Sequence, residues 1–220
     1  MATARVRFTA ENRRHQILEV ASQLFARQGF NGTTTRNIAE ASRVNEALIF
    51  RHFPSKEDLY WAVIEGKCKV GTWQKDLEAR LASGNSDREV FQGIAADILD
   101  IRRKDSSLSR LLLFSALENH TLSERFFRTN VAKYYELLAE YIAARIHDGA
   151  FRKVDPMLAA RGFLGMINYY FQVQELFGGK RYQQYDDAEA TAVLTDLWLN
   201  GIAVSGMPGT NGRTKKRIGK

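Results

Sequence analysis

Apolar residues recur at helical spacing along most of this chain. The stretch from about residue 11 to residue 28 shows the pattern, with apolar positions at Ile17, Leu18, Ala21, Leu24 and Phe25. Gly29 follows, and glycine readily takes the left-handed conformation that ends a helix. Only three prolines interrupt the sequence, and no alternating β-branched run bounded by turns occurs. The pattern therefore predicts an all-α protein.

Two short helices and a longer one are predicted next. A threonine cap opens a short helix over about 35–42, and a third helix covers about 45–52. Pro54 ends it, and the sequence SKED from Ser55 has the form of a capping box that starts a fourth helix. Similar boxes stand at Ser86 to Glu89 and at Thr121 to Glu124. Later helix boundaries are predicted at Gly149, at Asp155 with Pro156, at Gly178 and Gly179, and at Asp186 with Asp187.

The third predicted helix has two different faces. Within the sequence VNEALIFRHF, helical geometry places Val44, Ile49 and Phe53 on one apolar face that can hold the helices together. The residues left pointing elsewhere are Glu46, Ala47, Phe50 and Arg51. Two short helices joined by a tight turn after a longer helix form a helix-turn-helix, whose second short helix enters the DNA major groove. The second face is therefore the predicted DNA-reading surface.

A wider pattern runs through about the first sixty residues. It comprises Arg14, Ile17, Leu18, Ala21, Leu24, Phe25, Gly29, Phe30, Thr34, Thr35, Ile38, Ala39, Val44, His52, Phe53, Lys56 and Leu59. In order and spacing, these positions resemble the N-terminal signature of the TetR family of transcriptional regulators, in its AcrR-like form. The resemblance implies a DNA-binding domain over residues 1–54 and a helical effector-binding and dimerisation domain over 55–204. Residues 205–220 are predicted to form a basic disordered tail.

The matched positions can be given roles in DNA binding. Thr35 opens the second helix, where its hydroxyl and the free backbone N–H groups are expected to hold a phosphate. Arg36 can read guanine or neutralise a phosphate. Asn45 stands where the family usually has serine, and either residue can cap the recognition helix. Glu46 can accept a hydrogen bond from a cytosine amino group, and Ala47 can contact a thymine methyl group.

Further DNA contacts are expected from Phe50, Arg51, His52 and Lys56. Phe50 replaces the tyrosine common in the family and so lacks its hydroxyl, which Arg51 and His52 can compensate. Lys56, at the start of the fourth helix, is expected to pair with phosphate. Arg43 stands in the turn, where the family tends to have glycine. If the turn needs a positive φ, arginine costs about 1 kcal/mol there, so either the turn differs or a phosphate contact offsets the strain.

Positive charge is concentrated at the two ends of the chain. The formal net charge of the 220 residues is +7, to which residues 1–60 contribute +3, residues 61–204 −1 and residues 205–220 +5. Basic ends around a near-neutral middle favour a polyanion as the partner of the ends. The tail sequence RTKKRIGK can be a solvated end, a nonspecific DNA-binding arm or a remnant of cloning.

Other features narrow the class of protein. No stretch approaches the roughly 18 apolar residues of a membrane span, and no secretory signal is evident, so a cytoplasmic location is expected. The single cysteine, Cys68, excludes an intrachain disulfide and is expected to be a half-buried helix residue. No glycine-rich phosphate loop, HExxH or GxSxG motif occurs, and the four histidines lack metal-ligand spacing. The expected protein is not an enzyme and needs no cofactor or metal.

The last two predicted helices are apolar around more than one face. They lie in the sequences DPMLAARGFLGMINYYFQVQELFGG and AEATAVLTDLWLNGIA. Val193, Leu197 and Trp198 are expected to be exposed unless a partner covers them. A single recognition helix reads few bases, so a dimer on two half-sites about 34 Å apart or further is expected. These two helices are the predicted homodimer surface.

Large aromatic side chains are frequent between these regions. They can be plain core, or with a few polar groups they can line a cavity for an apolar or aromatic ligand. The predicted effector-binding residues are Trp61, Phe114, Tyr134, Tyr135, Phe163, Asn168 and Phe171.

The leading prediction is a dimeric repressor that a small hydrophobic or aromatic effector releases from its double-stranded DNA operator. The resemblance implies that the ligand tilts the fourth helix and so changes the separation of the two recognition helices. In the alternative, the protein binds DNA as a dimer, but its C-terminal domain is only a scaffold or a protein-docking site.

Overall fold

The computed structural model describes residues 10–68, 72–118 and 121–204, and for Cys68 only the backbone. The predicted disordered tail at 205–220 and the predicted half-buried side chain of Cys68 lie outside this description. The described residues form helices and one isolated antiparallel bridge, between Phe151 and Ala203. The all-α prediction is therefore confirmed.

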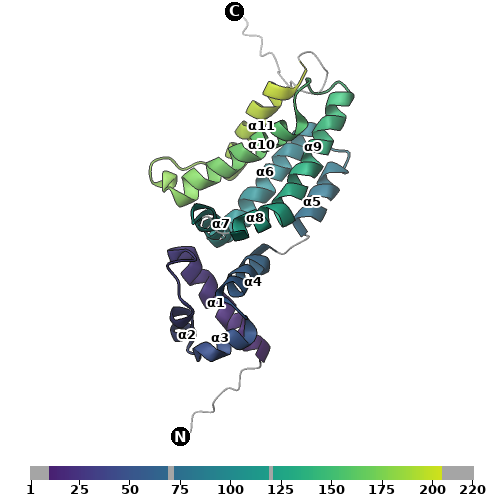
Figure 1. Ribbon diagram of the computed structural model, residues 1–220. Coiled ribbons are helices and arrows are strands. Elements are labelled where there is room, and N and C mark those ends of the chain that lie inside the picture. Colours follow the sequence, from purple (N-terminus) through teal and green to yellow (C-terminus); the bar gives the residue numbers. More distant parts are fainter. Residues whose placement is uncertain (1–9, 69–71, 119–120, 205–220) are drawn as a thin grey trace, which may run out of the picture. The chain divides into compact units, whose positions relative to one another are not determined.

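The chain divides into two compact units (Figure 1). The first contains residues 1–71 and 105–129, and the second contains residues 72–104 and 130–220. The unit that holds the helix-turn-helix is therefore larger than the segment 1–54, because it includes the fourth helix and a helical segment from the middle of the chain. Residues 1–54 remain the predicted DNA-binding part of this unit.

Six helices build the first unit. They are α1 (Ala10–Gln28), α2 (Thr35–Ser42), α3 (Glu46–His52), α4 (Lys56–Cys68), α7 (Ser107–Leu117) and α8 (Thr121–Phe126). The first three match the predicted helices to within about one residue. In the described part of this unit, α1 packs against α2, α4 and α7, and α3 packs against α2.

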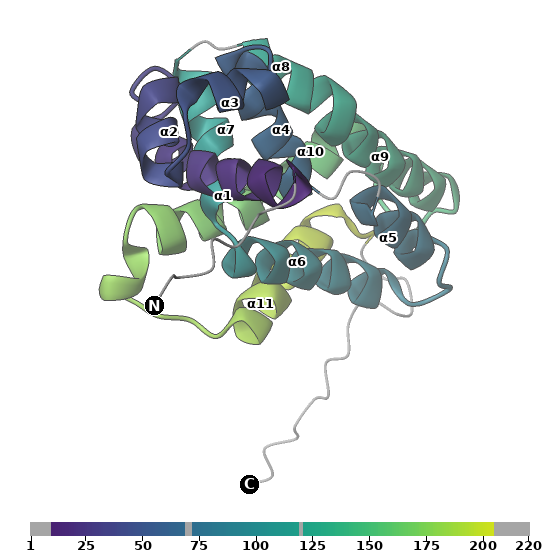
Figure 2. The same cartoon turned by 90° about the horizontal axis from the view of Figure 1, so that it is seen from below.

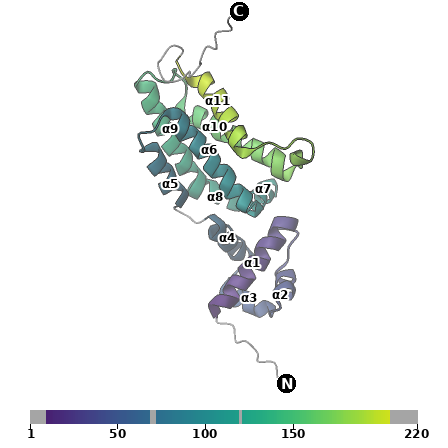
Figure 3. The same cartoon turned by 180° about the vertical axis from the view of Figure 1, so that it is seen from behind.

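Five α-helices build the second unit. They are α5 (Thr72–Leu81), α6 (Asp87–Lys104), α9 (Ala132–His147), α10 (Pro156–Phe171) and α11 (Asp187–Ile202). Helix α6 packs against α5, α10 and α11, and α9 packs against α5 and α10, as Figures 2 and 3 show from two further sides. Three short segments complete the chain: the π-helical turns η1 (Phe127–Val131) and η2 (Gln172–Leu176), and the 3-10 turn η3 (Gly179–Arg181).

Side-chain caps fix where several helices begin, as the sequence predicts. Ser55 accepts a hydrogen bond from the Asp58 N–H at 3.0 Å, and Asp155 accepts one from the Leu158 N–H at 2.6 Å. Asp186 caps α11 in the same way. Each cap satisfies a backbone donor that has no partner within its helix. The π-helical turn η2 was not predicted, because the pattern after Phe171 continues the α-helical period.

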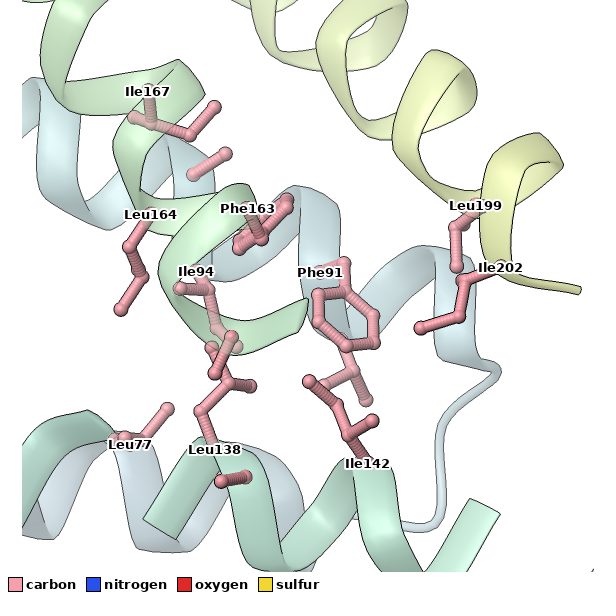
Figure 4. Close-up of a cluster of buried hydrophobic side chains, with 14 of the residues drawn as sticks. Leu77, Phe91, Ile94, Leu138, Ile142, Phe163, Leu164, Ile167, Leu199 and Ile202 are labelled. Atoms are coloured by element: carbon pink, nitrogen blue, oxygen red, sulfur yellow. The ribbon is translucent and has the colours of Figure 1, made fainter. Parts of the chain in front are cut away.

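The core of the second unit is centred on Phe91 of α6 (Figure 4). Its ring centre lies 4.9 Å from that of Phe163 and 4.3 Å from that of Trp198. Figure 4 shows Leu138 and Ile142 of α9 on one side of this cluster and Leu199 and Ile202 of α11 on another. The core therefore joins α6, α9, α10 and α11 around the ring of Phe91.

Trp198 corrects a prediction. It was expected at the surface of α11 together with Val193 and Leu197, which are indeed 50% and 61% exposed. The indole of Trp198 instead packs against Phe91 and Phe163. The reason is that its helix position lies one step around from Leu197, on the side facing α6.

The core of the first unit joins α1, α4 and α7. The rings of Phe25 and Tyr60 meet edge to face at 4.7 Å, and Phe30 packs on both. The Tyr60 hydroxyl donates to the Leu111 carbonyl of α7 at 2.7 Å, and burial raises the pKa of this phenol. A fully buried hydroxyl without a partner would cost free energy, so this bond allows tyrosine at the centre of the core.

Glu118, which follows α7, holds the turn after α1. Its carboxylate accepts hydrogen bonds from the backbone N–H groups of Phe30 at 3.0 Å and Asn31 at 3.3 Å. The carboxylate approaches Gly29 so closely that a Cβ atom there would lie 2.5 Å from it, and the φ of Gly29 is +73°. Glycine is required at position 29 on both grounds. The contact fixes the segment that leads from α1 into α2.

Replacing Glu118 with alanine is expected to destabilise the protein. The free energy of unfolding should fall by about 1–2 kcal/mol, because two backbone N–H groups lose a charged acceptor. Urea denaturation followed by circular dichroism measures this change. The control is Glu124→Ala, which removes only an exposed ion pair with Arg128 and should cost less than about 0.5 kcal/mol. Equal effects of the two changes would contradict the anchoring role of Glu118.

Candidate nucleic-acid interface

Local hydrogen bonds fix the starts of α2 and α3. Thr34 caps α2 by accepting from the Asn37 N–H at 3.1 Å, and the Asn37 side chain accepts from the Thr34 N–H at 3.2 Å. Asn45 caps α3 by accepting from the Ala47 N–H at 2.9 Å, as predicted. The capping pair of Thr34 and Asn37 was missed as a pair, although its T-x-x-N spacing is a readable variant of the capping box.

The two faces of α3 are as predicted. Ile49 and Phe53 are 1% and 2% exposed and belong to the core. On the other side, Ala47 and Arg51 are exposed and the large ring of Phe50 is 46% exposed. The apolar ring of Phe50 and the basic side chain of Arg51 therefore lie side by side on the surface of this seven-residue helix. That DNA contacts this face remains a prediction.

Thr35 and Glu46 bind one another across the two short helices. The Thr35 hydroxyl donates to the Glu46 carboxylate, with 2.5 Å between the oxygens. A hydroxyl has a single proton, so in this arrangement Thr35 cannot also donate to a phosphate. The backbone N–H groups at the start of α2 are the groups left for that contact. Glu46, in turn, is oriented by this bond and is only half-exposed.

The basic residues of the predicted interface differ in how they are held. Arg36 pairs with Glu40 at 3.0 Å, but both side chains are largely exposed, so the pair is weak and readily exchanged for a phosphate. Arg51 makes no hydrogen bond or ion pair with the residues that the structure describes. The Lys56 ammonium lies 4.1 Å above the Phe30 ring, and burial lowers its pKa. Arg51 is thus the most freely available cation of the three.

His52 is turned inward more than predicted. Its ring lies against Phe53, with 6.3 Å between ring centres, and Nε2 is buried without a hydrogen-bond partner. In this arrangement Nε2 is not available to a phosphate, and contact of the half-buried His52 with DNA stays a prediction. The structure therefore groups Ala47, Phe50 and Arg51 on the outer face, with Asn45 at its start, and sets His52 behind them.

Arg43 adopts the left-handed conformation that the sequence analysis considered for this turn. Its φ and ψ are 54° and 44°, and it is the one non-glycine residue with a positive φ in the described ranges. Its N–H donates to the Glu40 carbonyl at 3.1 Å, and the Val44 N–H donates to the Ala39 carbonyl at 3.0 Å, which closes the end of α2. The turn therefore has the left-handed conformation that is common at helix ends. Arginine adopts it despite the strain, and its exposed side chain has no partner among the described residues.

The predicted effector-binding residues fall in both units. Trp61 and Phe114 belong to the first unit, where Arg125 stacks over the Trp61 ring at 3.9 Å. The other five belong to the second unit. There Phe163 and Phe171 are fully buried in the core, Tyr134 and Tyr135 are half-buried beside it, and Asn168 has a buried side-chain oxygen without a partner.

The described ranges contain no group of three or more histidine, cysteine or acidic side chains placed to hold a metal ion. None of their helices is long and apolar enough to cross a membrane.

Comparisons with known proteins decide the family. Residues 17–63 match the family model of bacterial regulatory proteins of the TetR family, and residues 91–196 match that of the AefR-like transcriptional repressor C-terminal domain. The chain belongs to the TetR family. The match at 17–63 contains the whole of α2 and α3, so the helix-turn-helix lies within the matched segment of this TetR-family DNA-binding regulator.

Individual relatives agree with this placement. The transcriptional repressor KstR2 of Rhodococcus jostii is 28% identical over 68% of this chain and 73% of its own length. The nucleoid occlusion factor SlmA of Haemophilus ducreyi is 30% identical over 58% of this chain and 61% of its own, so the match spans less than two thirds of SlmA. The Bacillus subtilis regulator FadR, solved with stearoyl-CoA, shares the fold with a TM-score of 0.68 at 20% identity over 86% of this chain and 98% of its own.

The strained turn of this TetR-family regulator gives a testable expectation. Arg43→Gly should raise the free energy of unfolding by about 0.5–1 kcal/mol, because glycine adopts the left-handed conformation without strain. Arg43→Ala keeps the strain and should change stability little. Thermal unfolding of the three proteins measures the difference.

The same two variants test whether Arg43 contacts phosphate. Both remove an exposed guanidinium beside α3, so both should reduce the slope of log K against log salt concentration by about one. Fluorescence anisotropy with DNA from upstream of the gene measures the slope. An unchanged slope in both variants would show that the strain is not offset by a DNA contact.

Proposed function

We propose that this chain is a dimeric, ligand-responsive repressor that binds operator DNA through α3 and is released by a small apolar or aromatic effector. The observation that supports DNA reading most directly is the outer face of α3. This face begins at a capped helix start and exposes Ala47, Phe50 and Arg51, the last without a partner among the described residues. These groups can contact base edges, thymine methyls and phosphates. The chemistry is binding, with no catalytic step.

A dimer is supported by the exposed faces of α10 and α11. On α10, Leu158 and Tyr169 are 70% and 64% exposed, and Gly162 and Gly165 lie between them on the same side with open space around them. A glycine within a helix is less stable than alanine by about 1 kcal/mol, so two on one open face suggest the close approach of another backbone. The neighbouring α11 adds Val193 and Leu197.

An apolar effector is supported by the aromatic content of the second unit and by the structural neighbour FadR of Bacillus subtilis, which was solved with stearoyl-CoA. Repression is supported by KstR2, which is named a transcriptional repressor. The alternative, a second domain that serves only as a scaffold or protein-docking site, has its own support in SlmA, which is named a nucleoid occlusion factor. Ligand binding separates the two proposals.

Titration of the protein against labelled DNA from upstream of its own gene tests DNA reading. Arg51→Ala is expected to weaken binding about tenfold or more, and the double variant Arg36→Ala with Lys56→Ala is expected to abolish specific binding. Lys133→Ala, which changes an exposed lysine of the second unit, is the control. Equal binding to a scrambled sequence, by the wild type, would refute operator recognition at this site.

The dimer surface has a separate test. Leu197→Glu should convert the protein to a monomer in analytical ultracentrifugation, because a charge would be buried at the proposed interface. DNA affinity should then fall by about a hundredfold or more, since two linked half-site contacts become one. Tyr182→Glu is the matched control, because Tyr182 is 91% exposed and lies outside α10 and α11. A Leu197→Glu protein that remains dimeric would place the interface elsewhere.

A further inference from the structure

Three consecutive basic residues end α6, and only one of them lacks an anionic partner. Arg103 pairs with Asp187 and lies 3.5 Å from Glu175, and Lys104 pairs with Asp100 at 2.6 Å. Arg102 makes no ion pair or hydrogen bond with any residue in the part of the chain that the structure describes. It is also the most enclosed of the three.

Arg102 is half-buried beside one aromatic ring of α10, and two phenol groups of α9 lie near it. Its guanidinium carbon lies 5.6 Å from the centre of the Phe171 ring, at the end of α10. Burial lowers the pKa of Arg102, while the nearby phenol groups of Tyr135 and Tyr134 on α9 act in the opposite direction. The side chain stands one helical turn beyond the buried Leu99, so it continues the inner face of α6.

Among the described residues, no carboxylate forms an ion pair with Arg102. Asp97, the acidic group with the largest effect on neighbouring Tyr134, is paired with Arg80 at 2.5 Å. A second guanidinium, that of Arg161, lies 5.7 Å from the Tyr135 ring. A partly buried cation without a counter-charge loses hydration, and an aromatic face compensates for only part of that loss. The helix dipole favours a cation at this end of α6, but it acts equally on the exposed Lys104.

Unpartnered polar atoms also flank Phe171. Asn168 and Gln174 lie three residues before and three residues after it, and each has a buried side-chain oxygen without a hydrogen-bond partner in the described ranges. Gln174 lies in the π-helical turn η2, which begins directly after Phe171. Side-chain amides both donate and accept, and π-helical turns within helices often mark functional sites. Unsatisfied buried polar groups call for a partner from outside the chain.

We propose that Arg102 binds the negatively charged group of the effector, while Tyr134, Tyr135 and Phe171 contact its apolar part. The effector is then an amphipathic anion rather than a neutral hydrophobic molecule. This inference rests on the proposed function, because it presumes that the second unit binds an effector. The anion can be the carboxylate of a free acid or a phosphate of a coenzyme A thioester, and both supply oxygens that fit the guanidinium fork.

Thermal shift and calorimetric titration of the full-length protein test the proposal with three probes of equal chain length: dodecanoate, dodecan-1-ol and dodecanoyl-CoA. The variants are Arg102→Met, which removes the charge, Arg102→Lys, which keeps the charge but removes the fork, and Lys104→Met as the control. Lys104→Met changes the net charge equally, two residues further along α6 and at the surface.

The wild type and Lys104→Met should bind an anionic probe about tenfold or more tightly than Arg102→Met does, and Arg102→Lys should be intermediate. The alcohol should bind the wild type and Arg102→Met equally. Without any probe, Arg102→Met should be at least as thermally stable as the wild type, since an uncompensated charge has been removed. A purely structural role would lower its stability instead. Tighter binding of dodecanoate assigns the anion as a carboxylate, and tighter binding of dodecanoyl-CoA assigns it as a phosphate.

Three results would overturn the inference: equal binding of the anionic probes by Arg102→Met and the wild type, equal binding of acid and alcohol by the wild type, or no binding of any probe. Operator titration separates these from a failure of the proposed function. A wild type that binds the operator but no anionic probe refutes only the inference about Arg102. If the wild type binds an anionic probe through Arg102 but does not bind the operator, the proposed regulatory function is refuted and the proposed anion site is retained.

Discussion

Burial of Ile49 and Phe53 is the constraint on which the DNA-binding face depends. A seven-residue helix is too short to be stable by itself, so its orientation is set by the apolar side chains that it contributes to the core. Once these two residues are buried, the helical period leaves Ala47, Phe50 and Arg51 outside. The surface proposed to read DNA is therefore defined by the packing on the opposite side of the same helix.

Polar contacts then refine this arrangement. Glu118 binds backbone N–H groups that lie 88 and 87 positions earlier in the sequence, and so fixes the segment between α1 and α2. Tyr60 binds the backbone of α7 in the same unit. These bonds join a helix from the middle of the chain to the helix-turn-helix through hydrogen bonds rather than apolar packing alone. A displacement of α7 within this unit would therefore be felt at the turn before α2, which offers a physical route for regulation.

The second unit combines two kinds of environment. Around Phe91 the aromatic residues pack into a core, which is one of the two roles that the sequence analysis gave to the aromatic residues. Around Phe171 an aromatic ring contacts a cation, and polar atoms remain without partners among the described residues. Within those residues, the first environment satisfies its own groups, whereas the second does not. This contrast distinguishes residues that maintain the fold from those that can receive a ligand.

The sequence by itself determined the features that depend on residues a few positions apart. The helix starts at Asn45, Ser55, Asp155 and Asp186, the left-handed turn at Arg43 and the two faces of α3 follow from local hydrogen bonds and the helical period. Tertiary structure decided the rest: that Trp198 turns into the core, that Thr35 binds Glu46, and that His52 is drawn inward. It also decided that Arg102 has no partner among the described residues while Arg103 beside it has two. Such outcomes depend on which distant side chains the fold brings within reach, and no local spacing encodes them.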